Sequence, residues 1–130
     1  MNNRFVLTCM AIVSTQTIAM QPTFDQAELE THLFHDKPTA IKFYASWCGA
    51  CKSIQPVFEQ LEQTFGPDRM HFASINVDDV TDELKEYLKV YYLPFIVFFK
   101  EGRILYRIIG LNPKELYYRV RKYALPIKQG

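Results

Sequence analysis

The sequence predicts an α/β fold in which one sheet is flanked by helices. Segments rich in β-branched and aromatic residues alternate along the chain with segments whose apolar residues have helical spacing. The chain has 130 residues, 48% of them hydrophobic, which is enough for a single domain with a substantial core. Its net charge is +1 and its basic residues are scattered, so the composition does not indicate a nucleic-acid-binding protein.

The predicted elements follow one another without an internal repeat, a linker or a low-complexity tract. They are a helix over residues 23–35, a strand over 39–44, a helix from about 52 to 65, a strand over 71–77, a helix from 81 to about 89, a hairpin of 95–99 with 103–109, and a last helix between Asn112 and Pro126.

The first helix has two alternative N-terminal caps. Thr23 with Gln26 fits a capping box, and so does Asp25 with Glu28. Asp36-Lys37-Pro38 ends the helix, because the residue before a proline is disfavoured in the helical conformation.

The second helix is predicted from a single apolar face. Pro56 lies inside the helix and should bend it, because proline removes a backbone N–H. Gly66-Pro67 ends it. The apolar positions at helical spacing are Ile54, Val57, Phe58, Leu61 and Phe65.

The two later helices carry shorter apolar stripes. In the third helix we expect Leu84, Tyr87 and Leu88 to point inward. Asn112 caps the last helix, and Pro113 takes its first position. The buried stripe of the last helix is Leu116, Val120 and Ala124. We assign the aromatic residues of segment 95–99 and Tyr117, Tyr118 and Tyr123 to packing rather than to recognition.

Two cysteines separated by two residues, Cys48 and Cys51, stand where the 39–44 strand gives way to the second helix. The N-terminus of a helix has unpaired N–H groups and the positive end of its dipole, so it favours an anion. The thiolate is the reactive form of cysteine. The pattern therefore predicts that Cys48 is the attacking thiol and that Cys51 resolves a mixed disulfide.

The chain resembles the thioredoxin family over about residues 23–124. The match goes beyond the cysteine pair, which alone is a weak signal. The further matching positions are Trp47 before the first cysteine, Lys52 after the second, Pro56, Leu93-Pro94-Phe95, the turn Lys100-Glu101-Gly102, and Gly110.

The resemblance implies a thioredoxin-like fold with a central mixed sheet, and a protein thiol–disulfide oxidoreductase that needs no dissociable cofactor. It also implies a cis bond before Pro94, with the backbone of Leu93 free to bind a substrate strand. Trp47, Gly49 and Ala50 complete the implied substrate site, with Trp47 both a partly buried packing residue and a rim. The implied partners are protein thiols and disulfides and a second dithiol protein, which we expect to be membrane-embedded. We expect a monomer.

Lys42 departs from the family pattern. Most thioredoxins have a buried Asp at this position and a Lys across from it, where this chain has Ser74. The proton-relay role of that Asp cannot carry over. We interpret Lys42 as a residue that tunes the pKa of the Cys48 thiol, since a nearby ammonium favours the thiolate. The alternative is that the stem of Lys42 is buried while its ammonium reaches solvent.

Ala50 is the second departure, because thioredoxins usually have Pro there. Alanine keeps an N–H that proline lacks, which offers one more donor near the Cys48 thiolate. Both departures favour a stabilised reduced form and an oxidising or isomerising role.

Residues 1–19 have the pattern of a secretory signal peptide, which leaves residues 20–130 as the domain. Arg4 supplies the positive charge, residues 5–13 are uncharged and mostly apolar, and a small, polar segment ends at Ala19. We therefore expect a periplasmic or otherwise extracytoplasmic protein. The alternatives are that this segment forms the first β-strand of the domain, or that Cys9 is acylated as in a lipoprotein. No apolar run is long enough for a membrane-spanning helix.

Other functions of the cysteine pair stay open at this point. A structural zinc site would need further ligands, for which the candidates are His32, His35, His71 and Cys9. A cytoplasmic-type reductant, a non-catalytic chaperone or binding module, and a metal-delivery protein are also compatible with the pattern. The direction of electron flow is not determined, because oxidases, isomerases and reductants share these residues.

Overall fold

A computed structural model describes residues 24–33 and 36–126 of the chain. The predicted order of helices and strands is confirmed, with one added turn of 3₁₀-helix. The elements are α1 (Gln26–Leu33), β1 (Thr39–Tyr44), α2 (Gly49–Phe65), β2 (His71–Asn76), η1 (Val77–Asp79), α3 (Asp82–Leu88), β3 (Phe95–Lys100), β4 (Arg103–Ile109) and α4 (Pro113–Ala124).

The four strands form one mixed sheet in the order β2-β1-β3-β4. β1 runs parallel to β2 and antiparallel to β3, and β3 and β4 form the predicted hairpin. The hairpin turn uses Glu101 and Gly102, which have φ values of 51° and 75°. The fold is therefore the mixed-sheet α/β fold that the resemblance implies.

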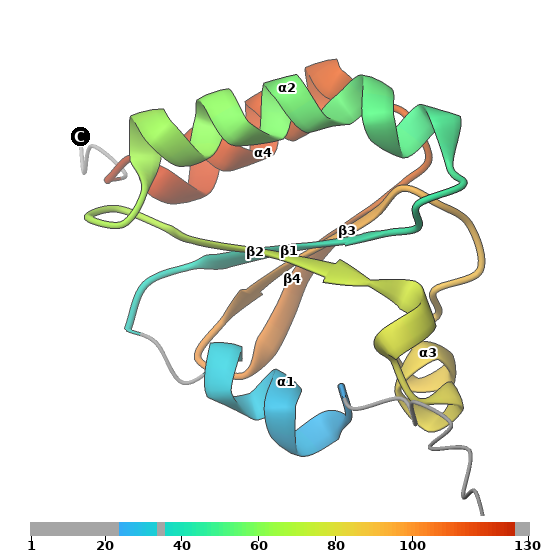
Figure 1. Cartoon of the computed structure of the whole chain (residues 1–130). Helices are drawn as coiled ribbons and strands as arrows, with labels where there is room; N and C mark the ends of the chain where they lie inside the picture. The colour runs from blue at the N-terminus through green and yellow to red at the C-terminus, as the bar shows by residue number, and fades with distance from the viewer. Residues whose placement is uncertain (1–23, 34–35, 127–130) are drawn as a thin grey trace, which may run out of the picture.

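Helices cover the two faces of the sheet in pairs, α2 with α4 on one side and α1 with α3 on the other (Figure 1). β1 is buried on both faces, which is why its sequence lacks a clean apolar–polar alternation. Ala40 belongs to the core under α2 and α4, whereas Ile41 and Phe43 belong to the core against α1 and α3. The sheet thus divides the interior into two cores, with β1 at the centre of both.

Each long helix buries the residues that the sequence predicted, except that Val57 of α2 is only partly buried against the same core. In α2 the buried residues include Ile54, Phe58, Leu61 and Phe65, and α4 buries Leu116, Val120 and Ala124. The Asn112 side chain caps α4 by accepting a hydrogen bond from the N–H of Glu115, at 3.1 Å.

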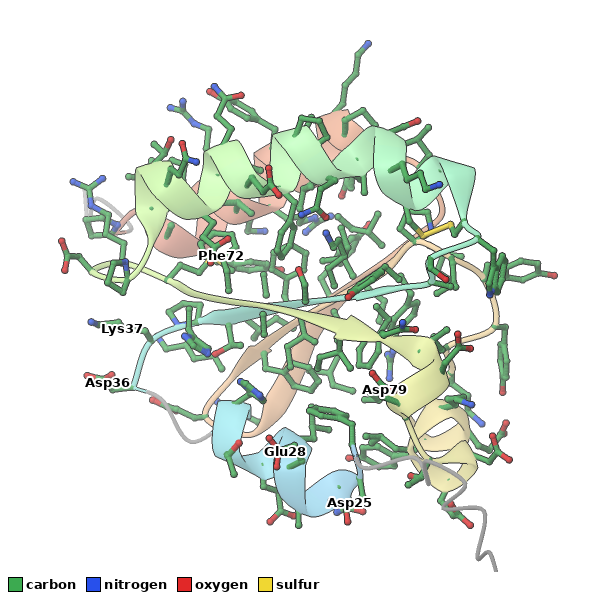
Figure 2. All side chains as sticks on the ribbon, in the orientation of Figure 1. Asp25, Glu28, Asp36, Lys37, Phe72 and Asp79 are labelled. Carbon is green, nitrogen blue, oxygen red and sulfur yellow. A yellow bond between two sulfur atoms is a disulfide. The ribbon has the colours of Figure 1, made fainter. Side chains whose placement is uncertain are left out.

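The cap of α1 is the second of the two alternatives. The Asp25 carboxylate accepts a hydrogen bond from the N–H of Glu28 at 3.0 Å at the start of α1, where both residues are labelled in Figure 2. Thr23 and the predicted signal peptide lie outside the described residues. Within those residues, no helix is long and apolar enough to cross a membrane.

Three tyrosines lie differently from the prediction. Tyr87 is 59% exposed rather than inward, because the buried series Val80, Leu84 and Leu88 has a spacing of four and Tyr87 falls to one side of it. Tyr117 and Tyr118 are exposed on α4, so their assignment to packing is wrong, whereas Tyr123 does pack against the core.

Gly66, which links α2 to β2, is enclosed by backbone. Its N–H donates to the carbonyl of Glu62 at 2.8 Å. A Cβ added there would lie 2.9 Å from that carbonyl oxygen and 3.3 Å from the carbonyl oxygen of Met70, both of which are backbone atoms that cannot move aside cheaply.

Gly66→Ala is therefore expected to lower the free energy of unfolding by about 1–3 kcal/mol, the usual cost of overpacking. Denaturant unfolding of the oxidised protein measures it. Gly49→Ala is the matched control, since a Cβ at Gly49 meets nothing within 4 Å; its effect should stay within about 0.5 kcal/mol. Equal effects of the two substitutions would contradict the argument.

Candidate active site

The cysteine pair lies where the buried strand β1 ends and α2 begins. Cys48 and Cys51 form a disulfide with their Cα atoms 5.3 Å apart (Figure 2). Cys48 is the N-cap residue of α2, and its Sγ accepts a hydrogen bond from the N–H of Cys51 at 3.2 Å. The sulfur thus takes the place that a capping oxygen has in most helices.

Both cysteines are largely buried in the disulfide form, with exposed fractions of 6% for Cys48 and 3% for Cys51. They pack with Ala45 in a small apolar cluster. A depression of about 210 Å³ opens beside Cys51, lined by Tyr44, Ala45, Ser46, Cys51, Lys52 and Gln55. Only a small part of each cysteine is therefore accessible to solvent in the disulfide form.

The loop before β3 closes the other side of the site. The Leu93–Pro94 peptide bond is cis, as expected from the resemblance. Leu93 packs against the cysteine cluster, and Pro94 is buried, its carbonyl accepting a hydrogen bond from the N–H of Gly110 at 2.8 Å. The motif positions Leu93, Pro94 and Gly110 are thus neighbours in space.

The remaining residues of the expected substrate site surround Cys48. Trp47 is 72% exposed, so it borders the site but does not have the partly buried packing role that we expected. Gly49 is exposed and Ala50 is half-buried against the cysteine cluster. As N1 and N2 of α2, these two residues present the first N–H groups of the helix next to Cys48.

Lys42 is fully buried on β1, with an exposed fraction of 0%. Its ammonium donates a hydrogen bond to the side-chain oxygen of Gln55 and lies 4.7 Å from the centre of the Phe58 ring. The amide nitrogen of Gln55 in turn donates to the carboxylate of Glu59. The alternative in which the Lys42 ammonium reaches solvent is therefore wrong, because Gln55 and Phe58 of α2 cover it.

Burial also changes the acidity of Lys42. Desolvation holds its pKa below the ordinary value of 10.5, while the charges of Glu59 and Glu62 act in the opposite direction. Ser74, the partner position on β2, pairs with Lys42 in the sheet register and is exposed. The role of Lys42 in tuning Cys48 stays a prediction.

Gln55 is the site residue that the sequence reasoning missed. It lies four residues after Cys51 on α2, borders the depression beside Cys51, and binds the only buried ammonium among the described residues. The i, i+4 spacing from Cys51 is the signal that could have found it.

The histidine candidates for a zinc site lie away from the cysteines. His32 and His71 approach each other, with 3.3 Å between Nδ1 of His32 and Nε2 of His71. His71 pairs with Thr39 at the start of β1, whereas the cysteines follow the other end of that strand. No group of three or more potential metal ligands occurs within residues 24–33 and 36–126. Cys9 and His35 lie outside the described residues.

Comparison with known proteins identifies the family. A model of the thioredoxin family matches residues 17–122. The chain belongs to the thioredoxin family.

Individual thioredoxins agree with this assignment. The chain is 34% identical to a thioredoxin of Malassezia sympodialis over 68% of its own length and 84% of the relative. It is 35% identical to the mitochondrial thioredoxin-2 of Schizosaccharomyces pombe over 74% of its length and 70% of that protein. The crystal structure of the Malassezia thioredoxin superposes with a TM-score of 0.71, at 29% identity, covering 78% of this chain and 89% of that one. The oxidised mitochondrial thioredoxin 3 of Saccharomyces cerevisiae gives a TM-score of 0.68 at 31% identity, covering 75% and 90%.

These thioredoxin relationships, together with the disulfide between Cys48 and Cys51, make the protein a thiol–disulfide oxidoreductase. It acts by thioredoxin-type exchange on protein disulfides, and its cysteine pair alternates between dithiol and disulfide.

The capping geometry predicts that the two thiols of the reduced protein differ in reactivity. Cys48 holds the position at which the α2 N–H groups stabilise a thiolate, so it should react with iodoacetamide at mildly acidic pH about tenfold faster than Cys51, or more. Peptide mapping after brief alkylation measures the two rates. Faster labelling of Cys51 would reverse the assigned roles.

Lys42→Met is expected to make the oxidised protein more stable at neutral pH, by about 1 kcal/mol, because it replaces a desolvated ammonium with an apolar chain of similar length. The gain should shrink as the pH rises toward 10.5. The unfolded chain binds the Lys42 proton more tightly than the folded one, so the stability of the unmodified protein increases with pH in that range.

Denaturant unfolding at several pH values measures the Lys42 effect. Lys52→Met removes the same charge from an exposed side chain beside the site and serves as the control. A stability difference for Lys42→Met that is independent of pH, like that of the control, would contradict the prediction.

Proposed function

We propose that this protein exchanges disulfides with substrate proteins outside the cytoplasm, with Cys48 as the attacking thiol. One observation carries the assignment of Cys48: its sulfur is the N-cap of α2 and already accepts the N–H of Cys51. A sulfur in that position is stabilised as a thiolate, and a thiolate is what attacks a disulfide.

The exchange proceeds in two steps with balanced electrons. The Cys48 thiolate attacks one sulfur of a substrate disulfide, forms a mixed disulfide and releases the other substrate sulfur as a thiolate. Cys51, 5.3 Å away between Cα atoms, then loses its proton and attacks Cys48. The substrate leaves with two thiols and the protein keeps the disulfide, so two electrons have moved to the substrate. The reverse sequence oxidises a substrate.

The substrate chain is proposed to bind in extended form against Leu93 and Pro94. Backbone groups at the start of β3 would pair with it, as in other cases where a peptide adds to exposed backbone. Trp47, Gly49 and Ala50 border the position where its cysteine meets Cys48. The protein is proposed to work as a monomer.

The extracytoplasmic location rests on the N-terminal segment. Arg4, the uncharged run 5–13 and the small residues that end at Ala19 support export. An exported protein would also need a redox partner that returns its cysteine pair to the starting oxidation state. We propose that a membrane-embedded dithiol protein supplies or accepts these electrons. A cytoplasmic reductant is the alternative.

The helix N-terminus supports an oxidising or isomerising direction. Residues N2 and N3 are the usual donors to an N-cap side chain, and here they are Ala50 and Cys51. Both have an N–H, so a Cys48 thiolate can accept two hydrogen bonds, which stabilises the reduced form. The buried charge of Lys42 is proposed to act in the same direction, because an ammonium close to Cys48 stabilises its thiolate.

Export is tested by mass spectrometry of the protein from its native host. The expected species begins near Met20 and is found outside the cytoplasm. Leu7→Arg, which places a charge in the apolar run of the signal peptide, should block the processing and serves as the control. A soluble cytoplasmic protein that retains residues 1–19 would contradict the proposed location and leave the exchange chemistry untouched.

The direction is tested by the reduction potential. Ala50→Pro removes one donor to the thiolate, worth about 1.4 kcal/mol, so the potential should fall by roughly 30 mV and the protein should become more reducing. Lys42→Met should shift the potential the same way. Equilibration with glutathione measures both, and Lys122→Met, which removes the charge of an exposed lysine on α4, is the control. A potential that stays constant or rises in Ala50→Pro would show that the N–H is not used.

A further inference from the structure

Exposed apolar side chains gather around the cysteine pair. Nine large hydrophobic residues are exposed in the described part of the chain. Five of them lie within two residues, along the sequence, of Cys48, of Leu93, which packs on the cysteine cluster, or of Gly110, which is hydrogen-bonded to Pro94. These five are Trp47, Tyr91, Tyr92, Ile109 and Leu111, with exposed fractions between 50% and 72%.

The contacts described above place these residues at one site. Leu93 packs on the cysteine cluster, which brings Tyr92 next to it. Phe95 pairs with Ile109, and the N–H of Gly110 donates to the Pro94 carbonyl. The three chain segments that carry these exposed apolar residues are therefore neighbours, and one of them contacts the cysteine cluster through Leu93. Tyr91 and Tyr92 are of particular interest, because neither position belongs to the motif that carries the family resemblance.

Tyr91 is held in place although most of it is exposed. Its hydroxyl lies 3.1 Å and 3.2 Å from the two carboxylate oxygens of Glu86. Lys89 forms an ion pair with the same carboxylate at 2.7 Å, and its ammonium lies 6.0 Å from the centre of the Tyr91 ring. These hydrogen bonds hold the pKa of Glu86 below its ordinary value, so the carboxylate stays charged and keeps its partners.

An exposed aromatic ring whose position is fixed by hydrogen bonds is suited to binding. It loses little conformational entropy when a partner covers it, and tyrosine contributes a large apolar area with few rotatable bonds. The ion pair also matters for selectivity, because Glu86 and Lys89 neutralise each other. The ring pair therefore presents an apolar surface without a net charge, which fits an uncharged partner better than an acidic or basic one.

We propose that Tyr91 and Tyr92 form an aromatic platform that contacts the substrate chain beside its reacting cysteine and selects an apolar or aromatic residue there. Tyr92 directly precedes Leu93, which packs on the cysteine cluster, so the residues that flank a substrate sulfur bonded to Cys48 pass next to the platform. The occupant is thus a segment of the substrate protein, and this inference rests on the proposed function in substrate exchange.

The test uses two disulfide-bonded peptides that are identical except for one residue next to the cysteine, Phe in one and Ser in the other. The measured quantity is the ratio of kcat/KM for the two peptides with the full mature chain. We expect the Phe peptide to be preferred by about tenfold, a value typical of one well-placed aromatic contact. Tyr91→Ala/Tyr92→Ala should reduce that ratio to within about threefold of unity.

Two further variants make the result specific. Tyr117→Ala/Tyr118→Ala removes another pair of exposed tyrosines, 50% and 55% exposed, from α4 and should keep the full preference. Tyr91→Phe/Tyr92→Phe keeps the rings and should retain most of the preference. If the tyrosines acted only through their hydroxyl groups, this variant would lose the preference.

The outcomes separate this inference from the proposed function. Exchange with both peptides at equal rates, or a preference that survives in Tyr91→Ala/Tyr92→Ala, would overturn the platform and leave the exchange activity standing. Loss of preference in the Tyr117→Ala/Tyr118→Ala control would also overturn it. An unmodified protein that exchanges with neither peptide would contradict the proposed function itself.

Discussion

The hydrogen bond from the N–H of Cys51 to the sulfur of Cys48 is the interaction on which the rest of the site depends. It fixes the sulfur at the first turn of α2, where the helix favours negative charge. β1 determines where that turn lies, because the strand is buried on both faces and cannot shift without opening two cores. The reactive atom is thus positioned by a strand that is packed on both of its faces.

Lys42 shows how this arrangement constrains the interior. A strand that must be apolar on both faces contains a buried ammonium, which Gln55 and the ring of Phe58 accommodate. Among the described residues, no buried side-chain nitrogen or oxygen lacks a hydrogen-bond partner. The cost is therefore one of desolvation rather than of a missing hydrogen bond, and such a cost is tolerated most readily where the charge has a function.

The sequence was sufficient for those features that depend on local spacing. The apolar face of α2, the cap at Asn112 and the strand–helix junction at Cys48 follow from periodicity and capping chemistry, and the structure confirms each. The features that depend on neighbours distant in the sequence were not predictable in the same way. Trp47 could not be placed without knowing that nothing packs over it, and the coverage of Lys42 by Gln55 depends on the distance between β1 and α2. The family resemblance supplied the cis bond at Pro94, which no local pattern contains.

The outer strand β4 affects whether two copies of this protein can associate through their sheets. In the described part of the chain, β4 ends the sheet at one side, where unpaired backbone groups could add a strand from another molecule. Exposed arginines at 103 and 107 flank that edge, and the Arg107 side chain donates to the carbonyl of Leu88 at 3.2 Å, which ties α3 to β4. A register shift between Phe98 and Phe99 further disturbs the regular ladder. Positive charge and irregular pairing both disfavour edge-to-edge association of two copies through β4, which leaves this side of the sheet protected against strand addition.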